Sequence, residues 1–310
     1  MTPLPSPQQL RYLVTLAELR HAGRAALACS VTQSTLSSGI LALERQLDTA
    51  ILDRTAGKRV VITPLGLELA ERARAALTAL EAVSEAAAAA RAPMAGPLRL
   101  GVIPTISPFL LPRLMPALRE AFPKLRLYLR EDTTGRLVDG LGAGRLDLLL
   151  LALPCDTDGA DTLAVARDEF LVALPPGHRL AMEARVPMAA LGGERLLLLE
   201  DGHCLREHAL AVCGLLAGER ADHEAFAATS LHTLVQMVAG GLGVTLLPRL
   251  AVSGGVAAGA DIVLRPLAGS GGWRTLGLAW RPASPRASDY RAVGAQLAAV
   301  CAEALAGGSA

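Results

Sequence analysis

Apolar residues at helical spacing run through the first part of the chain. Pro7 opens a first helix that extends to Glu18, with apolar residues recurring on one face. A short alanine-rich helix follows and is broken by the letters CSV. Thr32 can cap a third helix, from Gln33 to Leu47, in which apolar residues recur at every third or fourth position. The polar side chains on its open face are Gln33, Ser34, Thr35, Ser37 and Ser38.

The second and third helices form a candidate DNA-binding motif. Two helices joined by a short turn, the second opening with short polar side chains, are typical of a helix-turn-helix. We therefore predict that Thr32 and the polar residues of the open face contact DNA. An ordinary helical hairpin has the same spacing and stays open as the alternative. Gly39 lies inside the third helix, where glycine costs roughly 1 kcal/mol of helix stability.

A short basic hairpin is predicted after the third helix, in the segment LDRTAGKRVVITPLG. Ala56 and Gly57 make its turn, and Arg54, Lys58 and Arg59 cluster around that turn. Lys and Arg side chains gain affinity for DNA by releasing counterions from phosphates, without reading the base sequence. The hairpin is therefore expected to act as a wing on the DNA backbone, although a solvated basic turn would have the same composition.

A long alanine-rich helix is predicted next. Thr63 can cap it, Pro64 suits its first position, and it runs to about Arg91, where the letters RAPMAGP indicate a linker. Its apolar residues alternate steps of three and four, which is the pattern of a coiled-coil seam. One small domain cannot bury such a seam, so we expect pairing with a second copy of the chain. The seam residues are Leu69, Ala73, Ala76, Leu80, Val83 and Ala87.

Strands alternate with helices from the linker to the end of the chain. This alternation predicts an α/β domain with a parallel sheet, and its length favours two lobes with a cleft between them. The main expected helices are residues 110–121, 231–239 and 289–305. The expected strands are LRLGVIP, LRLYLRE, DLLLLALP, EFLVALP, RLLLLED, GVTLLP, IVLRPL and TLGLAW.

Composition narrows the class of protein. The 310 residues are 52% apolar and 19% charged, which is a globular composition. No run of 18 apolar residues occurs and the first residues lack the features of a signal peptide, so we expect a cytoplasmic protein without a membrane partner. The net charge of +1 leaves the partner open, because a basic patch on one domain can be balanced elsewhere.

Cysteine and histidine usage does not predict a metal site. The five cysteines show no C-x-x-C pair or zinc-finger spacing, and the histidines are scattered. No nucleotide-binding loop or nucleophile elbow is present either, so no cofactor is expected. Cys29, Cys155 and Cys301 are interpreted as small buried hydrophobic residues. Spacing alone favours the same interpretation for Cys213 and leaves it open for Cys204.

The whole chain resembles the LysR-type transcriptional regulators. The N-terminal signature is carried by AA…CSVTQSTLSSGILALERQL…LDRT…VVITPLG. The resemblance implies a winged helix-turn-helix in residues 1–63, a linker and dimerisation helix in residues 64–92, and a regulatory domain in residues 93–310. That domain is expected to have a periplasmic-binding-protein-like α/β fold with two lobes. Their expected bounds are approximately 97–162 with 269–306, and 163–268.

Five further segments are similar to the peroxide-sensing activators of this family. They are GVIPTISPFLLPRLMPAL, FPKLRLYLRED, LLLLEDGHCLREHALAVC, ATSLHTLVQMVAGGLGVTLLP and RTLGLAWRP. The resemblance implies that Cys204 is the residue that reacts with hydrogen peroxide and that Cys213 resolves it as a disulfide. It places Thr105, Thr134, His203 and Arg274 around the reactive thiol. It further implies a homodimer or homotetramer on double-stranded DNA, contact with RNA polymerase, and a thiol reductant that resets the protein.

The residues around Cys204 suit that chemistry. The thiolate is the form that attacks peroxide, and Cys204 is expected at or near a helix N-terminus, where the dipole favours negative charge. Arg206 can add a positive charge and His203 can donate a hydrogen bond. The hydroxyls of Thr105 and Thr134 can hold a peroxide oxygen and donate a proton. The product, a sulfenic acid, condenses readily with a second thiol.

The implied disulfide demands a change of fold. If residues 204–213 form one helix, nine positions give a rise of about 13.5 Å and place the two side chains on opposite faces. A disulfide needs Cα atoms within about 7 Å of each other. The helix must therefore unwind at least in part, and the altered surface would shift how regulatory domains pair.

Two other functions remain open from the sequence. One is a LysR-type regulator that binds a small molecule in the cleft near Thr105 and Thr134, with incidental cysteines. The other is a cysteine peroxidase, which would not need an N-terminal DNA-binding module. We expect a regulator and not an enzyme.

Overall fold

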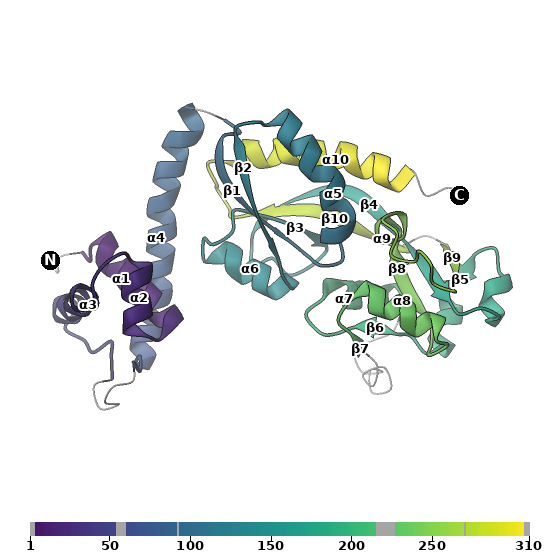
Figure 1. Ribbon diagram of the computed structural model, residues 1–310, viewed down its shortest axis with the longest axis horizontal. Helices are drawn as coiled ribbons and strands as arrows, with labels where there is room; N and C mark the ends of the chain where they lie inside the picture. Colours follow the sequence, from purple (N-terminus) through teal and green to yellow (C-terminus); the bar gives the residue numbers. More distant parts are fainter. Residues whose placement is uncertain (1–3, 54–59, 92, 215–226, 270, 307–310) are drawn as a thin grey trace. The chain divides into compact units, whose positions relative to one another are not determined.

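The computed structural model describes residues 4–53, 60–91, 93–214, 227–269 and 271–306 (Figure 1). The chain divides into two compact units, which comprise residues 1–88 and residues 89–310. We call them the N-terminal unit and the C-terminal unit.

Three helices form most of the core of the N-terminal unit: α1 (Pro7–Leu19), α2 (Ala22–Ala28) and α3 (Gln33–Leu47). The first helix begins with a capping box, in which Ser6 Oγ accepts from Gln9 N and Ser6 N donates to Gln9 Oε1. The two longer helices predicted from the sequence are thus confirmed. The fully buried apolar residues are Leu13, Leu16, Ala25, Leu36, Ile40 and Leu43.

The packing of α1 against α3 explains the glycine inside α3. A Cβ atom built on Gly39 would stand 2.6 Å from Cδ2 and 2.7 Å from Cε2 of the Tyr12 ring. Carbon atoms that pack well lie about 3.5 to 4.0 Å apart, so no other residue fits there without moving the ring. Gly39 therefore serves the core of this unit, although it lowers the intrinsic stability of the helix.

A buried carboxylate fixes the segment that follows α3. Glu44 Oε1 accepts from Ile51 N at 2.9 Å and from Leu52 N at 3.0 Å, and Leu52 pairs with Ile62 in an isolated antiparallel bridge. This bridge lies at the base of the predicted hairpin. The basic residues of the expected wing lie outside the described residues: Arg54, Lys58 and Arg59.

Helix α4 (Pro64–Arg91) begins within the N-terminal core and extends beyond it. Thr63 Oγ1 accepts from Gly66 N at 2.9 Å, which is the predicted cap. Ala73 is 4% exposed, whereas Leu80 is 48% and Val83 is 69% exposed. The early part of the predicted seam is therefore covered within the unit, and its later residues present apolar surface to the outside.

A mixed sheet organises the C-terminal unit, with strand order β2-β1-β3-β10-β4-β9-β5 and β8 paired with β4. Strands β1, β2 and β3 are mutually parallel, but β10 is antiparallel to both β3 and β4. The main strands are β1 (Gly96–Val102), β2 (Leu125–Glu131), β3 (Leu148–Leu153), β4 (Asp161–Leu174), β8 (Thr245–Pro248), β9 (Val263–Ala268) and β10 (Trp273–Trp280).

The expectation of a parallel sheet is wrong for about half of these strands, because a strand buried on both faces has the same apolar pattern in either direction. Strand β4 is also longer than its apolar segment EFLVALP indicates. Its first part pairs with β10 and its last part, Phe170–Leu174, pairs with β8 and β9. It therefore runs through two groups of strands.

Helices cover this sheet and a smaller one. Helix α10 packs against α5, as Figure 1 shows, while α7 and α8 lie beside the two-stranded sheet β6-β7. The segment RLLLLED contributes only β6 to regular strand structure, and β5 and β7 were not predicted. The helices are α5 (Ser107–Ala121), α6 (Thr134–Gly142), α7 (Cys204–Val212), α8 (Leu231–Ala239), α9 (Arg249–Ser253) and α10 (Ala287–Ala306), with short 3-10 helices at Arg179–Met182 and Met188–Gly193. The short strands are β5 (Val186–Pro187), β6 (Leu198–Leu199) and β7 (Ala227–Ala228).

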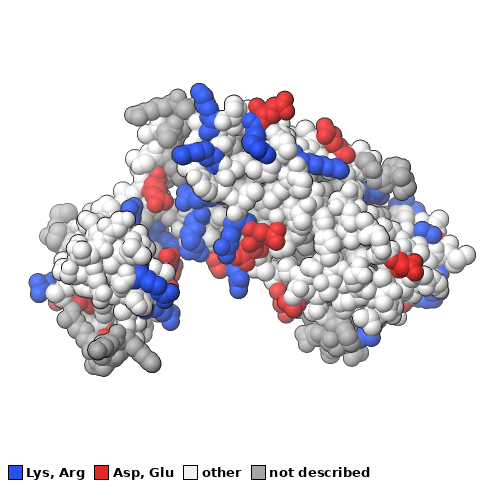
Figure 2. Space-filling model, in the orientation of Figure 1, with Lys and Arg blue, Asp and Glu red and all other residues white. Residues whose placement is uncertain are grey.

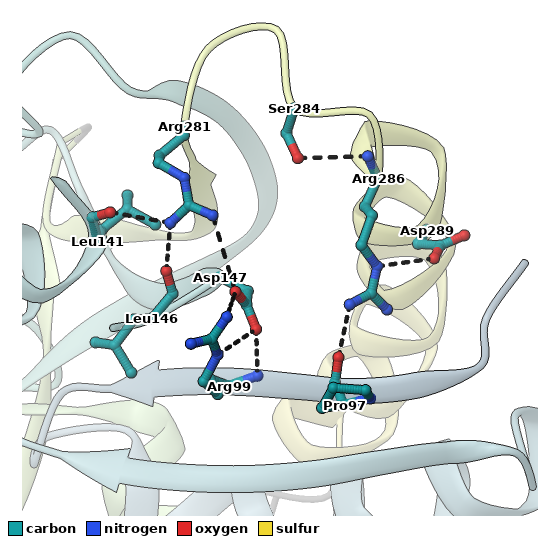
Figure 3. A network of polar contacts seen from close by, with 9 residues as sticks. All are labelled: Pro97, Arg99, Leu141, Leu146, Asp147, Arg281, Ser284, Arg286 and Asp289. Atoms are coloured by element: carbon teal, nitrogen blue, oxygen red, sulfur yellow. Dashed lines mark hydrogen bonds and ion pairs between the residues drawn. The ribbon is translucent and has the colours of Figure 1, made fainter. Parts of the chain in front are cut away.

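A polar network ties β1 to the segments before β3 and after β10 (Figure 3). Asp147, 3% exposed, accepts from the backbone N of Arg99 at 2.7 Å and from its guanidinium at 3.0 and 3.1 Å. Arg281 lies 3.8 Å from the same carboxylate and donates to the carbonyl oxygen of Leu146 at 2.6 Å. The buried negative charge is thus paired, which avoids the large penalty of an isolated one.

No single helix in the described part of the chain is long and apolar enough to cross a membrane, and α2 with α3 meets that criterion only as a pair bent by 97°. Within the same residues, no group of three or more His, Cys, Asp or Glu side chains could hold a metal ion.

Candidate functional site

Cys204 is the first residue of helix α7 and is 9% exposed. The turn before it requires glycine, since Gly202 adopts a φ of +92°. The side chain of His203, at the N-cap, makes no capping hydrogen bond. The first backbone N–H groups of a helix lack intrahelical partners and favour negative charge nearby. The Cys204 sulfur therefore occupies a buried position at the helix end that carries partial positive charge.

The start of α6 docks on the turn that leads to Cys204. Thr134 N donates to the carbonyl oxygen of Gly202 at 3.3 Å. The Thr134 side chain is buried, and its Oγ1 has no hydrogen-bond partner among the described residues. A buried hydroxyl without a partner is unfavourable by roughly 1 to 3 kcal/mol, so it marks a position where a polar ligand can be accepted.

A buried ion pair holds Thr105. Arg274 Nε donates to Asp168 Oδ2 at 3.0 Å, and both side chains are fully buried. The same guanidinium donates from Nη1 to Thr105 Oγ1 at 2.8 Å and from Nη2 to the Thr105 carbonyl oxygen at 3.0 Å. Because Thr105 Oγ1 accepts from the arginine, its own O–H can donate to another group. Asp168, which also accepts from Leu250 N, was not predicted from the sequence.

Arg206 is buried, and its described contacts are with the turn before α7. Its Nη1 donates to the carbonyl oxygen of Leu199 at 3.3 Å, and its Nε lies 3.0 Å from Asp201 Oδ1. The guanidinium thus fastens the segment between β6 and α7 and supports the position of the helix start.

Two histidines near Cys204 have lowered pKa values. Burial lowers the pKa of His203, and the charge of Glu200 opposes that shift. Burial also lowers the pKa of His208, which is opposed by its hydrogen bond to Pro154 and reinforced by the positive charge of Arg274. Both rings are therefore neutral at pH 7. His208 was not predicted as a site residue, although its spacing of four from Cys204 places both on one helix face.

Cys213 caps the C-terminal end of α7 and is 9% exposed. Burial raises the pKa of its thiol to about 11. Helix α7 is continuous between the two cysteines, and both are free thiols. The rise of about 13.5 Å expected for nine helical positions therefore separates their backbones.

The predicted DNA-contacting residues of α3 form one exposed face, while Leu36 and Ile40 are buried. Thr32 Oγ1 accepts from Thr35 N at 3.2 Å and lies 2.8 Å from the hydroxyls of Ser34 and Thr35. The exposed residues are Thr32, Gln33, Ser34, Thr35, Ser37 and Ser38.

A cavity of about 460 Å³ lies between β2 and α6 and is lined by none of the residues predicted around the reactive thiol. Figure 2 shows Lys and Arg side chains over this region, with Asp and Glu side chains among them. Asp132 lies 2.7 Å from Arg130 and 3.4 Å from Arg136, and the hydrogen bond from Arg130 lowers the pKa of Asp132. The positive charges at this cavity are thus partly neutralised.

Comparison with known proteins gives a consistent result over the whole chain. Residues 7–67 match the family described as bacterial regulatory helix-turn-helix protein, lysR family, and residues 91–302 match the LysR substrate binding domain. The DNA-binding transcriptional dual regulator OxyR of Escherichia coli K12 is 42% identical over 283 residues, which cover 91% of this chain and 92% of that protein. A probable hydrogen peroxide-inducible genes activator of Mycobacterium avium is 43% identical over 287 residues, covering 93% and 91% of the two chains.

Solved structures agree with these relatives. A cysteine variant of full-length OxyR from Pseudomonas aeruginosa has a TM-score of 0.75 and 34% identity, covering 95% of this chain and 98% of that chain. A cysteine variant of Corynebacterium glutamicum OxyR, bound to hydrogen peroxide, has a TM-score of 0.68 and 31% identity, with coverage of 100% and 96%. The predicted resemblance to LysR-type regulators and their peroxide-sensing members is confirmed.

Proposed function

The chain belongs to the LysR family of bacterial regulatory proteins, and from this premise we propose that it regulates transcription in response to hydrogen peroxide through Cys204. The observation that carries this proposal is a buried thiol at a helix start, next to a turn whose Gly202 carbonyl accepts from the backbone N–H of Thr134; the Thr134 hydroxyl has no hydrogen-bond partner among the described residues. The names of the relatives and the peroxide bound to one of them support the choice of signal.

The first step is a displacement at sulfur. The Cys204 thiolate attacks one peroxide oxygen, an S–O bond forms as the O–O bond breaks, and the second oxygen leaves as hydroxide that takes up a proton to become water. The Thr134 and Thr105 hydroxyls donate hydrogen bonds to the peroxide oxygens, where negative charge develops. Arg274 orients Thr105 for that role. Neutral His203 can donate without placing a further cation in the buried site.

The second step couples oxidation of the Cys204 sulfur to a conformational change. The sulfenic acid on Cys204 condenses with the thiol of Cys213, releasing water and forming a disulfide. Because α7 keeps the two residues apart, the helix must unwind at least in part for this bond to form. The surface around α7 then differs between the two redox states and changes how regulatory units pair.

The N-terminal unit carries the output. The exposed polar face of α3 enters the major groove of double-stranded DNA, and the predicted wing contacts phosphates. Exposed Leu80 and Val83 on α4 provide the seam through which two copies pair, and two such dimers form a homotetramer on an extended site. We further propose that the oxidised form activates transcription through RNA polymerase in the cytoplasm, and that a thiol reductant resets it without enzymatic turnover.

The decisive experiment treats the purified full chain with one equivalent of hydrogen peroxide, then alkylates free thiols and maps the peptides by mass spectrometry. We expect Cys204 and Cys213 to be lost together as a linked pair, with an altered DNA footprint. A Cys204→Ser variant should keep the reduced footprint at the same dose. A Cys29→Ser variant, altered in the N-terminal unit far from α7 in sequence, is the matched control and should respond like the parent.

Different outcomes separate the proposal from its two alternatives. Both cysteines remaining free after peroxide, with DNA binding altered only by a small molecule, would identify an inducer-binding regulator. Continuous peroxide consumption with a reductant, at a rate independent of DNA, would identify an enzyme. A full peroxide response in Cys204→Ser would remove Cys204 from the mechanism.

A further inference from the structure

A third cysteine belongs to a segment that contacts the face of α7 carrying Cys204. Strand β3 ends at Leu153, and the next residues are Pro154 and Cys155. The Nε2 atom of His208 donates to the Pro154 carbonyl oxygen at 2.9 Å. Since His208 follows Cys204 by one helical turn, the face of α7 that carries both residues points toward this segment. The structure therefore brings the segment after β3 against the face of α7 that carries Cys204 and His208.

Electrostatics also relate Cys155 to Cys204. The half-buried Cys155 packs against the hydrophobic core to which Cys204 belongs. Burial raises the pKa of Cys155 to about 12, and negative charge on Cys204 and on Asp156 contributes to that shift. Coulombic interaction decays with distance, so this effect indicates that the two cysteines lie in the same region of the C-terminal unit.

The two thiols that could form a disulfide with Cys204 thus differ in the structural change that the bond requires. Cys213 lies at the far end of α7, about 13.5 Å away along the helix axis, and can reach Cys204 only if the helix unwinds. Cys155 belongs to the segment after β3, which already contacts α7 through the hydrogen bond between His208 and the Pro154 carbonyl oxygen. Closing a bond to Cys155 needs a local adjustment at the end of β3 and leaves the hydrogen bonds within α7 in place.

We infer that Cys155 is a second resolving residue, which forms a disulfide with oxidised Cys204 while α7 stays folded. The inference rests on the proposed function, because peroxide must first convert Cys204 to a sulfenic acid. The Sγ atom of Cys155 then attacks the Cys204 sulfur, an S–S bond forms, the S–O bond breaks, and the hydroxyl leaves as water with the thiol proton. Hydrogen peroxide is the only oxidant required.

Oxidation of Cys204 itself prepares this step. A sulfenic acid carries no charge in place of the thiolate, so the contribution of Cys204 to the raised pKa of Cys155 disappears when Cys204 reacts, while burial, its largest cause, remains. His208 Nδ1 is buried and has no hydrogen-bond partner among the described residues, and the ring is neutral at pH 7 because burial lowers its pKa. It is therefore available as a proton acceptor on this face of α7.

The two disulfides would have opposite consequences. A Cys155–Cys204 bond retains the reduced shape of α7 and shields the sulfur of Cys204 from further oxidation. A Cys204–Cys213 bond requires the rearranged shape. Cys155 would therefore raise the peroxide dose at which the chain changes shape, and a Cys155→Ser variant should form more Cys204–Cys213 disulfide at a given low dose.

The test uses the full-length Cys213→Ser variant, with Cys213→Ala as a second version in case serine disturbs the buried position. After one equivalent of peroxide, we expect the loss of two thiols per chain and a non-reduced peptide that links Cys155 to Cys204. The Cys155→Ser, Cys213→Ser double variant should instead accumulate a sulfenic acid on Cys204 that dimedone traps. A Cys29→Ser, Cys213→Ser double variant is the matched control and should still form the link.

The outcomes distinguish a failure of the Cys155–Cys204 disulfide from a failure of peroxide sensing by Cys204. Dimedone-labelled Cys204 with fully alkylated Cys155 in the single Cys213 variants would overturn the inference and leave peroxide sensing by Cys204 intact. Unoxidised Cys204 in every variant would overturn both. Hydrogen exchange gives a second readout: amides of residues 205–212 should stay protected in the Cys155–Cys204 form. Equal loss of protection in both disulfide forms would contradict the claim that α7 stays folded.

Discussion

Replacing Thr134 by valine should raise stability and lower peroxide reactivity at the same time. The Thr134 side chain is buried, and its hydroxyl has no partner among the described residues. Valine has the same shape without the polar atom, so it removes a penalty of about 1 to 3 kcal/mol for an unsatisfied buried group. For a unit of this size, each kcal/mol corresponds to about 2 to 4 °C in Tm. Calorimetry of the full chain measures this gain.

The same change removes a donor from the reaction. A hydrogen bond to a charged group contributes about 1.5 to 3 kcal/mol, which corresponds to a rate of Cys204 oxidation roughly 10- to 100-fold lower. Quenching the reaction at short times with an alkylating reagent, followed by mass-spectrometric quantification of alkylated and oxidised Cys204 peptides, gives this rate. A higher Tm together with slower oxidation of Cys204 is specific to this role of the hydroxyl, because a substitution that merely disrupts a buried position lowers both stability and activity.

Thr133 offers the matched control for this pair of measurements. It precedes Thr134 and is half-buried, and its side chain makes no capping hydrogen bond. A Thr133→Val variant should change the free energy of unfolding by less than about 0.5 kcal/mol and leave the oxidation rate unchanged. The reasoning is refuted if Thr134→Val lowers Tm while Cys204 reacts at the parental rate.

Three further predictions concern other parts of the chain. Gly39→Ala should destabilise the N-terminal unit by about 1 to 3 kcal/mol through the clash with Tyr12, measured as weaker protection of α1 and α3 amides in hydrogen exchange. Asp168→Asn should destabilise the C-terminal unit by about 3 to 5 kcal/mol, because Arg274 keeps a buried charge without its counterion; urea unfolding measures this loss. Because burial lowers the pKa of His208, the unfolded state binds its proton first, so stability should fall as pH drops through 6.5; His208→Gln should weaken that dependence in urea titrations at pH 7.5 and 5.5.

Controls follow from the same contacts. A Gly135→Ala variant meets no atom within 4 Å and should leave protection unchanged, so similar losses at both glycines would contradict the packing argument. An Asp168→Asn variant as stable as the parent would show that the ion pair contributes no net stability. A His208→Gln variant with the same pH dependence of stability as the parent would exclude His208 as its cause.

Local rules explain why the helices could be predicted and the direction of the strands could not. The predicted helix at residues 231–239 agrees with α8, whose start is capped by Ser230 Oγ accepting from Thr233 N at 3.2 Å. Caps of this kind involve residues three positions apart, so the sequence displays them. The pairing of β10 with β3 and β4 involves residues more than a hundred positions apart, and a buried strand shows the same apolar letters in either orientation.

Some contacts of the candidate site are likewise between residues close in sequence and others between distant ones, and only the first kind could be predicted. Cys204 and His208 share a helix face, and their spacing alone could have linked them. Thr105, however, lies 169 positions from Arg274, so no periodicity relates them. Cys155 looked like an incidental core residue because its neighbour across the fold comes from another element. A cysteine that stands alone in the sequence is therefore not necessarily unreactive. The chemistry of its thiol depends on which charged or oxidisable group the fold places beside it.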